Sequence, residues 1–333
     1  MRPAALIYNP TAGRQRHAQV LGAVLAALRK GGFEVEPVPT SGPGEATLLA
    51  RDRAARGMDT VFAFGGDGTL REVAAGLLGT ETALGIVPGG TANVLARSLG
   101  LPRDPLGAAE LAGRLEVQRL DVGLVSGGAA KTLTPIPSPD SRDLSFPPLP
   151  GRGSGKWERG SGGEGIPFLM MFSAGLDSAV LAGLDTRLKW RIGKAAYLYQ
   201  GLREWWRYPY TRFEVEADGE SLEASFVAVS NIPYYGGTFA LAPGARPHDG
   251  QLDLVLFRGH GRLATMRFAL DLLRGAHQRR PDVFIRHVRQ VVLRSPAGAA
   301  AQIDGDLCEQ RLPLTVQIAP HPLRVLCPEI PPA

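Results

Sequence analysis

A buried-strand pattern that ends in a glycine-rich turn is the feature of this sequence that most restricts its fold. The stretch from Val61 to Val73 reads VFAFGGDGTLREV: four apolar residues, then Gly-Gly-Asp-Gly-Thr, then a helix-like pattern. This order is typical of a strand–helix unit in a parallel sheet. Glycines let the backbone approach an anion, and the N-terminus of the following helix favours negative charge. The unit therefore predicts either a phosphate-binding turn or, as the simpler alternative, a plain connection in which Asp67 caps the helix.

The same alternation of strand and helix runs through the first 125 residues. Two more polar, glycine-bearing turns follow predicted strands, Asn-Pro-Thr-Ala-Gly at 9–13 and Pro-Gly-Gly-Thr-Ala-Asn at 88–93. Three such turns would meet at the carboxyl edge of a parallel sheet, where open α/β folds bind ligands. Residues 1–125 are therefore predicted to form a nucleotide-binding domain, although the P-loop and dinucleotide fingerprints are both missing. Strands are expected at 4–8, 33–38, 61–64 and 84–87, and helices at 19–29, 45–56, 70–78 and 92–98.

The character of the chain changes after Val125. Residues 126–166 are rich in Pro, Gly and Ser and carry no hydrophobic period, so we expect a disordered insertion, with a Pro-rich docking peptide as the alternative. From 167 to 322, short and often alternating apolar runs separated by turns predict an antiparallel sheet or sandwich. Helical stretches at 188–206 and 262–277 interrupt these runs.

The predicted fold class is thus an α/β N-terminal domain with a parallel sheet, followed by an all-β, sandwich-like C-terminal domain. The last strand-like run, LRVLCP, resembles those of the second domain. It begins a C-terminal tail, 323–333, for which packing back on the first domain is an option.

Composition limits the partners and the location of the protein. Its 333 residues include 37 Lys and Arg against 32 Asp and Glu, a formal charge of +5 that suits an anionic ligand or an acidic membrane surface. No nucleic-acid partner is expected, and a homodimer remains open. Two cysteines, Cys308 and Cys327, are too few for a disulfide framework, which favours reduced thiols in the cytoplasm. No uncharged apolar run reaches about 18 residues, so membrane contact is expected to be peripheral.

Six motifs, taken in order, resemble those of the diacylglycerol kinase catalytic-domain family, in particular soluble bacterial lipid kinases related to sphingosine kinases. The resemblance covers nearly the whole chain apart from 127–165. It implies a first domain like that of phosphofructokinases and NAD kinases, a β-sandwich second domain, and ATP with Mg²⁺ as cofactors. It also implies transfer of the γ-phosphoryl group to a hydroxyl of diacylglycerol, a sphingoid base or a related lipid at a membrane surface. The motifs are NPTAG (9–13), GGDGTLREV (65–73), PGGTANVLARSLGLP (88–102), SAGLDS (173–178), APGARPHDGQLDL (242–254) and DGD (304–306).

The same resemblance implies a nucleotide site on the first domain, where Asp67 would organise metal and phosphates. Arg71 stands where the family usually has Asn, and a guanidinium near a triphosphate is physically sensible. The implied nucleotide-binding residues are Asn9, Thr40, Gly65, Gly66, Asp67, Gly68, Thr69, Leu70, Arg71 and Thr91.

Two acidic turns of the second domain complete the implied site. A structural Mg²⁺ would be held by the carboxylate of Asp249 and the backbone carbonyls of Arg246 and Gln251, although from the residues alone a plain hairpin turn is the favoured explanation of this loop. Asp304-Gly305-Asp306 resembles the Asp-Gly-Glu that carries the family's proposed general base. Asp304 is the first choice for the base and Asp306 the second.

Alternatives remain open at this point. A relative of NAD kinase or phosphofructokinase would also carry GGDGT, and a non-catalytic lipid- or nucleotide-binding protein would explain the departures at Arg71, His248 and Asp306. A further question concerns Tyr197, Trp205, Trp206 and Tyr208, which accompany Arg203 and Arg207. That mixture suits a lipid headgroup region, but core packing is the favoured alternative.

Overall fold

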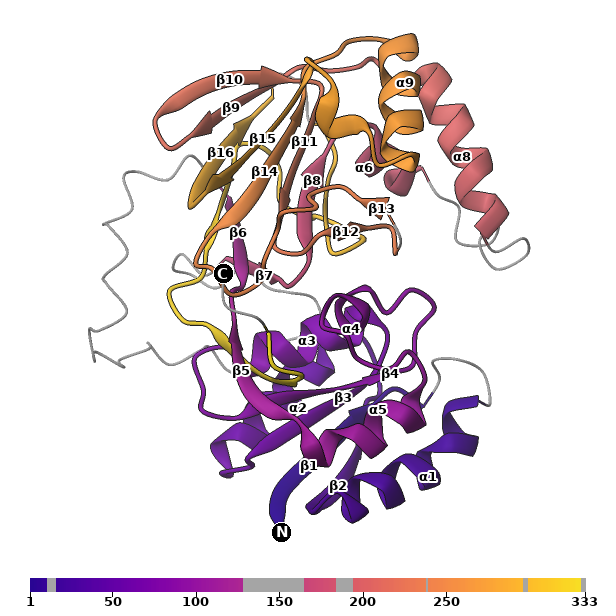
Figure 1. Cartoon of the computed structure of the whole chain (residues 1–333), viewed down its shortest axis with the longest axis vertical. Helices are drawn as coiled ribbons and strands as arrows, with labels where there is room; N and C mark the ends of the chain where they lie inside the picture. The colour runs from indigo at the N-terminus through magenta and orange to yellow at the C-terminus, as the bar shows by residue number, and fades with distance from the viewer. Residues whose placement is uncertain (11–15, 128–164, 184–193, 238, 296–298, 331–333) are drawn as a thin grey trace. The chain divides into compact units, whose positions relative to one another are not determined.

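A computed structural model of the chain describes residues 1–10, 16–127, 165–183, 194–237, 239–295 and 299–330 (Figure 1). These residues divide into two compact units. The first contains the described residues of 1–122 and of 319–330, and the second contains 123–127 together with those of 165–318. Most of the predicted insertion lies outside the described residues.

The first unit is built on a six-stranded sheet in the order β2-β1-β3-β4-β20-β5. Strands β1, β2, β3 and β4 are parallel to one another, and β20 is parallel to β4. Strand β5 is antiparallel to β20. The predicted parallel sheet is therefore confirmed. The strands are β1 (Arg2–Tyr8), β2 (Phe33–Pro39), β3 (Thr60–Gly65), β4 (Ala83–Pro88), β5 (Glu116–Leu120) and β20 (Leu323–Cys327).

Helices cover both faces of this sheet. Because the crossovers are right-handed and the direction of strand order reverses after β2, the first helix lies on one face and the next two on the other. Strand β3 is buried along its full length, which explains why its sequence is apolar without alternation. The helices are α1 (Arg16–Lys30), α2 (Glu45–Ala55), α3 (Asp67–Leu77), α4 (Val94–Ser98) and α5 (Pro105–Leu111), followed by the short η1 (Ala112–Arg114).

The second unit contains two antiparallel six-stranded sheets. Their orders are β10-β9-β16-β19-β6-β7 and β15-β14-β11-β8-β17-β18, and a separate pair is formed by β12 and β13. The strands are β6 (Gly123–Gly127), β7 (Ile166–Phe168), β8 (Met171–Ala174), β9 (Phe213–Ala217), β10 (Glu220–Ala224), β11 (Phe226–Ser230), β12 (Tyr234–Tyr235), β13 (Phe239–Ala240), β14 (Leu252–Phe257), β15 (Val283–Val288), β16 (Gln290–Arg294), β17 (Ala301–Ile303), β18 (Asp306–Leu307) and β19 (Leu314–Ile318).

The two sheets share one apolar core. Leu252, Leu254 and Leu256 of β14 enter it, while the alternate residue Phe257 faces the other side. There its ring stacks on Phe268 of α9 (Arg262–Leu273), with 4.4 Å between ring centroids. The predicted sandwich is confirmed, and helices interrupt it as expected. The described part of the unit also contains α6 (Leu176–Ala182), α8 (Lys194–Arg207) and η2 (His277–Arg279) besides α9.

Three sequence expectations need correction. Helix α9 ends at Leu273, before the predicted residue 277, because Gly275 takes a left-handed conformation (φ 67). Core packing is wrong for Trp206, whose side chain is 61% exposed. The run LRVLCP, which looks like a strand of the second domain, is β20 of the first unit's sheet. No helix in the described part of the chain is both long and apolar enough to cross a membrane.

Candidate functional site

Four turns of the first unit follow the carboxyl ends of neighbouring parallel strands. Asn9 follows β1, Thr40 follows β2, Gly66 follows β3 and Gly89 follows β4. The strand register pairs Tyr8 with both Pro39 and Phe64, and Gly65 with Pro88, so the four turns meet at one edge. A cavity of about 210 Å³ lies at this edge, lined by Asn9, Thr40, Gly42, Pro43, Ala46, Gly68, Thr69 and Glu72.

The two glycine turns after β3 and β4 contact each other through their backbones. A Cβ added to Gly90 would lie 2.5 Å from Cα of Gly66 and 2.9 Å from Oδ1 of Asn93. Asn93 closes the second turn: its Oδ1 accepts the Gly90 N–H (2.9 Å) and its Nδ2 donates to the Gly90 carbonyl (3.1 Å). Glycine is thus needed at 90 for this close approach, and a Cβ at 66 would be in tight contact, 3.3 Å from Cα of Gly90.

Asp67 links these two turns. Its Oδ2 accepts the N–H of Val94 (3.2 Å) and its Oδ1 accepts the N–H of Leu95 (3.4 Å), the first two residues of α4. The N-cap residue of α3 is Gly66, so the expectation that Asp67 merely caps its own helix is wrong. Burial raises the pKa of Asp67, while the backbone N–H groups of Val94 and Leu95 act in the opposite direction.

The other residues predicted to bind the nucleotide differ in the groups that they could present to a ligand. The side chain of Leu70 is buried in the core, so this residue can present only its main chain to a ligand. Gly65 is buried at the end of β3, Arg71 is half-buried on α3, and Thr91 is exposed. None of these three lines the cavity.

Four residues of the cavity wall were not predicted from the sequence. Gly42, Pro43 and Ala46 come from the segment between β2 and α2, and Glu72 comes from α3. The signal for the first three was available, because Ser-Gly-Pro-Gly at 41–44 follows a parallel strand as the other turns do. No sequence signal pointed to Glu72, because its position depends on how α2 and α3 pack. Thr47 Oγ1 donates to the Glu72 carbonyl at 2.8 Å.

In the second unit, the acidic turn at 304–306 separates its two carboxylates. Asp304 and Gly305 form the two-residue loop between β17 and β18, both with positive φ (50 and 88). Three backbone N–H groups donate to the Asp304 carboxylate: those of Met170 (3.0 Å) and Met171 (2.9 Å) to Oδ1, and that of Leu169 (2.9 Å) to Oδ2. Asp304 therefore anchors the loop to the β7–β8 turn, whereas Asp306 is exposed.

A chain of hydrogen bonds connects this turn to the SAGLDS motif. The Gly305 N–H donates to Oε1 of Gln302, and Nε2 of Gln302 donates to Ser173 Oγ, both at 2.7 Å. The hydroxyls of Ser173 and Tyr235 both donate to Oδ2 of Asp177, in the first turn of α6. Burial raises the pKa of Asp177, and the Ser173 hydroxyl acts in the opposite direction. The SAGLDS motif therefore belongs to a hydrogen-bond network of Gln302, Ser173, Asp177 and Tyr235. This role was not predicted from the sequence.

The predicted metal loop precedes β14. Asp249 Oδ1 accepts the Gln251 N–H at 3.0 Å and Gly250 has φ 73, a geometry that also fits the plain-turn alternative. Arg246 is exposed on the same loop. In the described part of the chain, no group of three His, Cys, Asp or Glu side chains is placed to hold a metal. A cation here would need backbone carbonyls and water beside one carboxylate, a donor set that suits Mg²⁺.

A second carboxyl group lies near this loop. The carboxyl group of Asp253 on β14 is 3% exposed, and burial raises its pKa to about 6. His287, whose Nδ1 lies 3.6 Å from Asp253 Oδ1, lowers this pKa, and the neighbouring Asp249 raises it. Asp249 and Asp253 therefore repel each other when both are ionised, although burial is the larger cause of the raised pKa of Asp253.

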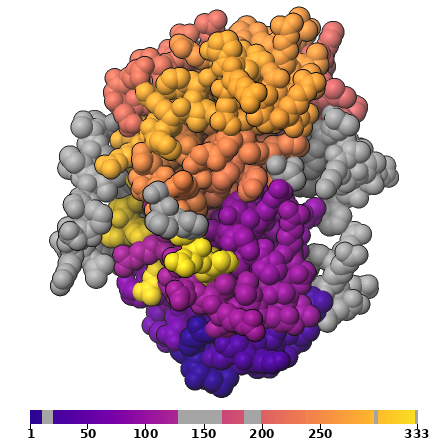
Figure 2. Space-filling view, in the orientation of Figure 1, coloured from indigo at the N-terminus to yellow at the C-terminus, as the bar shows by residue number. Residues whose placement is uncertain are grey.

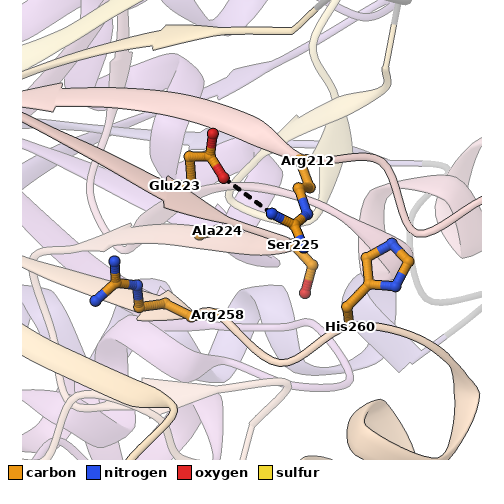
Figure 3. Close-up of a pocket in the computed structure, with 6 residues that line it drawn as sticks. All are labelled: Arg212, Glu223, Ala224, Ser225, Arg258 and His260. Carbon is orange, nitrogen blue, oxygen red and sulfur yellow. Dashed lines mark hydrogen bonds and ion pairs between the residues drawn. The ribbon is translucent and has the colours of Figure 1, made fainter.

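Another cavity, of about 120 Å³, lies in the second unit (Figure 3). Its charged side chains are exposed, and Arg212 pairs with Glu223 at 3.0 Å. No residue predicted for catalysis, nucleotide or metal lines it, so we do not assign the candidate site to it. It is lined by Arg212, Glu223, Ala224, Ser225, Arg258 and His260.

Comparison with known proteins identifies the two units. The family model described as diacylglycerol kinase catalytic domain matches residues 3–125, and that described as YegS C-terminal NAD kinase beta sandwich-like domain matches residues 170–327. The diacylglycerol kinase of Bacillus subtilis (strain 168) is 27% identical over 311 residues, which cover 92% of this chain and 90% of that protein. A Pseudomonas aeruginosa (strain UCBPP-PA14) protein described as "probable lipid kinase YegS-like" is 29% identical over 321 residues. The match covers 95% of this chain and 92% of that protein.

A solved structure shows the same fold. The crystal structure of a putative diacylglycerol kinase from Bacillus anthracis str. Sterne superimposes on this chain with a TM-score of 0.73. The superposition covers 98% of this chain and 95% of that protein, and the two sequences are 22% identical. The two domains, in this order, define a kinase. Residues 3–125 belong to the diacylglycerol kinase catalytic-domain family, as their motifs predicted, and residues 170–327 match the second domain of such lipid kinases.

Proposed function

We propose that this chain is an ATP-dependent lipid kinase that transfers the γ-phosphoryl group to a hydroxyl of diacylglycerol or a related lipid. The observation that carries the proposal is the cavity at the carboxyl edge of the parallel sheet, where Asn9, Thr40, Gly68 and Thr69 meet. The names of the relatives support a lipid as the acceptor, because they are described as diacylglycerol kinases or a probable lipid kinase.

The phosphates of ATP would bind at the start of α3. The first backbone bond of the helix is donated by Leu70 to the Gly66 carbonyl (3.1 Å), and the Asp67 N–H is bonded to its own carboxylate, which leaves the N–H groups of Gly68 and Thr69 to face a ligand. These N–H groups and the positive end of the helix dipole attract an anion, and the Thr69 hydroxyl adds another donor. Asp67 keeps the second glycine turn beside the first through its bonds to α4.

Mg²⁺ is the second component of the proposal. Asp249, with the backbone carbonyls of Arg246 and Gln251, would hold one ion on the second unit, consistent with the carboxylate repulsion described above. When bound, Mg²⁺ supplies positive charge that offsets carboxylate and phosphate charge.

We assign the general base to Asp306 rather than to Asp304, the first choice from sequence. Three N–H donors already occupy the Asp304 carboxylate, which gives it a structural role in holding the β7–β8 turn. Asp306 is exposed, and the adjacent Gly305 is held by Gln302. A carboxylate in that position would accept the proton of the lipid hydroxyl as the phosphoryl group is transferred.

A kinase of a soluble substrate is the second candidate. The description of the second-domain model as NAD kinase-like favours it. A non-catalytic relative, the third candidate from sequence, would bind ATP without turnover.

The experiment is a substrate panel with radiolabelled ATP and Mg²⁺. Diacylglycerol and a sphingoid base are presented in mixed micelles, and NAD and fructose phosphate are presented in solution. We expect label in a lipid; label only in NAD or the sugar would establish the second candidate, and ATP binding without any label would establish the third.

Asp67→Ala tests the site within the same assay, with Asp104→Ala as a matched control. Each aspartate caps a helix in the first unit: Asp67 caps α4, and Asp104 accepts the Gly107 N–H at the start of α5 (2.7 Å). Both substitutions should lower the free energy of unfolding by about 1 kcal/mol, and only Asp67→Ala should abolish phosphorylation. Undiminished turnover in Asp67→Ala would exclude the assignment.

A further inference from the structure

Two helices of the second unit, α8 and α9, expose large apolar side chains to solvent. Seven of the thirteen such exposed side chains in the described residues lie on these two helices. A concentration of this kind marks an interaction surface. The side chains and their exposed fractions are Tyr199 (57%), Leu202 (60%) and Trp206 (61%) on α8, and Leu263 (66%), Met266 (41%), Leu270 (42%) and Leu273 (59%) on α9.

The two helices carry the same exposed pattern. Apolar residues stand at 199, 202 and 206 on α8 and at 263, 266 and 270 on α9, which is a spacing of three and then four residues in both. One arginine, Arg203 or Arg267, occupies the same relative position in each pattern and is exposed. Residues at these spacings lie on one side of a helix, so each helix presents an apolar stripe edged by a guanidinium group.

The C-terminal end of α8 and the N-terminal end of α9 are bound to each other. The Arg262 guanidinium lies 4.2 Å from the centroid of the Trp206 ring and donates to the Trp206 carbonyl at 2.7 Å. Trp205 Nε1 donates to the Arg262 carbonyl at 3.0 Å. Figure 1 shows the two helices next to each other on the second unit, and in Figure 2 the orange atoms of the α9 region form part of the surface. The two stripes are therefore adjacent where Trp206 and Leu263 approach each other, and together they are called the α8–α9 face.

This face is positively charged. The two helices contain one carboxylate each, and both are half-buried and already bonded: Glu204 accepts from Gln200 (3.0 Å), and Asp271 pairs with Arg280 (2.7 Å). The exposed charged side chains on and beside the stripes are Arg203, Arg207, Arg262, Arg267 and Arg274.

We propose that α8 and α9 form a docking face for an anionic lipid bilayer. Apolar and aromatic side chains would enter the headgroup region while the arginines contact lipid phosphates. Proteins that bind the surface of a bilayer commonly combine aliphatic, aromatic and guanidinium groups in this way. The carboxylates of α8 and α9 are half-buried, which also fits an anionic partner. Docking goes beyond the proposed kinase activity and needs no phosphoryl transfer, so its failure and that of the kinase proposal are distinguishable.

Co-sedimentation of the full chain with vesicles, without nucleotide, tests the proposal. One set of vesicles is phosphatidylcholine, and in the other about a third of the lipid is phosphatidylglycerol. The charge variant is Arg203→Gln with Arg267→Gln, and the apolar variant is Leu202→Ser with Leu263→Ser. The matched control, Leu48→Ser with Arg51→Gln, makes the same changes at exposed positions of α2.

We expect the unmodified chain to bind the anionic vesicles, more weakly as salt is added, and the neutral vesicles far less. Each double variant should lose binding by about tenfold or more, while the control keeps it. Because every changed side chain is exposed, all variants should unfold at the same temperature as the unmodified chain. Equal binding by all variants, or equal binding to neutral vesicles, would overturn the proposal. So would self-association in sedimentation velocity that either variant abolishes, because a second copy would then occupy the face.

Discussion

At the scale of the residue, the structure distinguishes carboxylates that look alike in sequence. Asp304 and Asp306 are separated by one glycine, yet the first is bonded to three backbone N–H groups and the second is exposed. A carboxylate with that many donors serves to hold the chain in place, because removing it leaves buried N–H groups without partners.

Asp304→Asn and Asp306→Asn should therefore fail in different ways. Asp304→Asn should lower the free energy of unfolding by about 2–4 kcal/mol, because an amide cannot accept all three N–H groups. Asp306→Asn should change stability by less than about 0.5 kcal/mol and lower kcat by about 100-fold or more. Urea unfolding and steady-state kinetics measure the two effects. A stable but inactive Asp304→Asn, paired with an active Asp306→Asn, would reverse the assignment.

Asp177 should make stability depend on pH. Its pKa is raised by burial, so the folded state favours the protonated form, and its contribution to stability is lost as pH rises through the raised pKa. Asp177→Asn should therefore gain stability relative to the unmodified chain as the pH rises from about 4, the ordinary pKa of an aspartate, toward neutrality. Thermal unfolding across that range measures the difference, and parallel curves for the two proteins would contradict it. Ser221→Ala, an exposed change on β10, is the control.

At the scale of the element, the strand–turn–helix units of the first unit were predictable because their signals are local. Apolar runs and glycine turns predicted β1 to β4 and α1 to α4 within a few residues, and the confirmed parallel sheet follows from their order. The contact between the glycine turns was not predictable, because it joins Gly66 to Gly90 through backbone atoms alone. The anchoring of Asp304 was equally hidden: its partner Leu169 is 135 residues away in the chain.

Gly90→Ala tests the contact between the turns. Its new methyl group would lie 2.5 Å from Cα of Gly66, and backbone cannot move aside as a flexible side chain would. We expect a loss of about 2 kcal/mol or more in the free energy of unfolding, together with weaker ATP binding. Gly22→Ala, inside α1 with no atom within 4 Å of the added carbon, should instead stabilise the chain by about 0.5–1 kcal/mol. Equal effects of the two substitutions would show that the turns do not need the close approach.

At the scale of the whole molecule, the chain passes from the first unit to the second near residue 122 and returns near residue 319. The two passages lie together, since the Ala319 N–H donates to the Val122 carbonyl at 2.6 Å. After its return the chain inserts β20 between β4 and β5, where Val325 and Cys327 are fully buried. No local pattern separates this strand from those of the sandwich, because its placement depends on the space between two distant strands.

Two truncations test the importance of β20. A chain that ends at Ile318 loses this strand, and β4 and β5 then lose their shared partner. We expect rapid hydrogen exchange at the amides of β4 and a loss of ATP binding, because β4 leads into the second glycine turn. A chain that ends at Pro328 keeps β20 and should behave as the full chain does. Unchanged exchange in the shorter chain would show that β20 is dispensable.

The position of β20 also has a consequence for biosynthesis. Roughly 200 residues separate it from β5, so at about 5–20 residues per second a ribosome needs on the order of 10–40 s to deliver it. During that interval β4 and β5 of the nascent polypeptide lack the strand that joins them. The sheet that carries the glycine turns can therefore be completed only after the second unit has been translated.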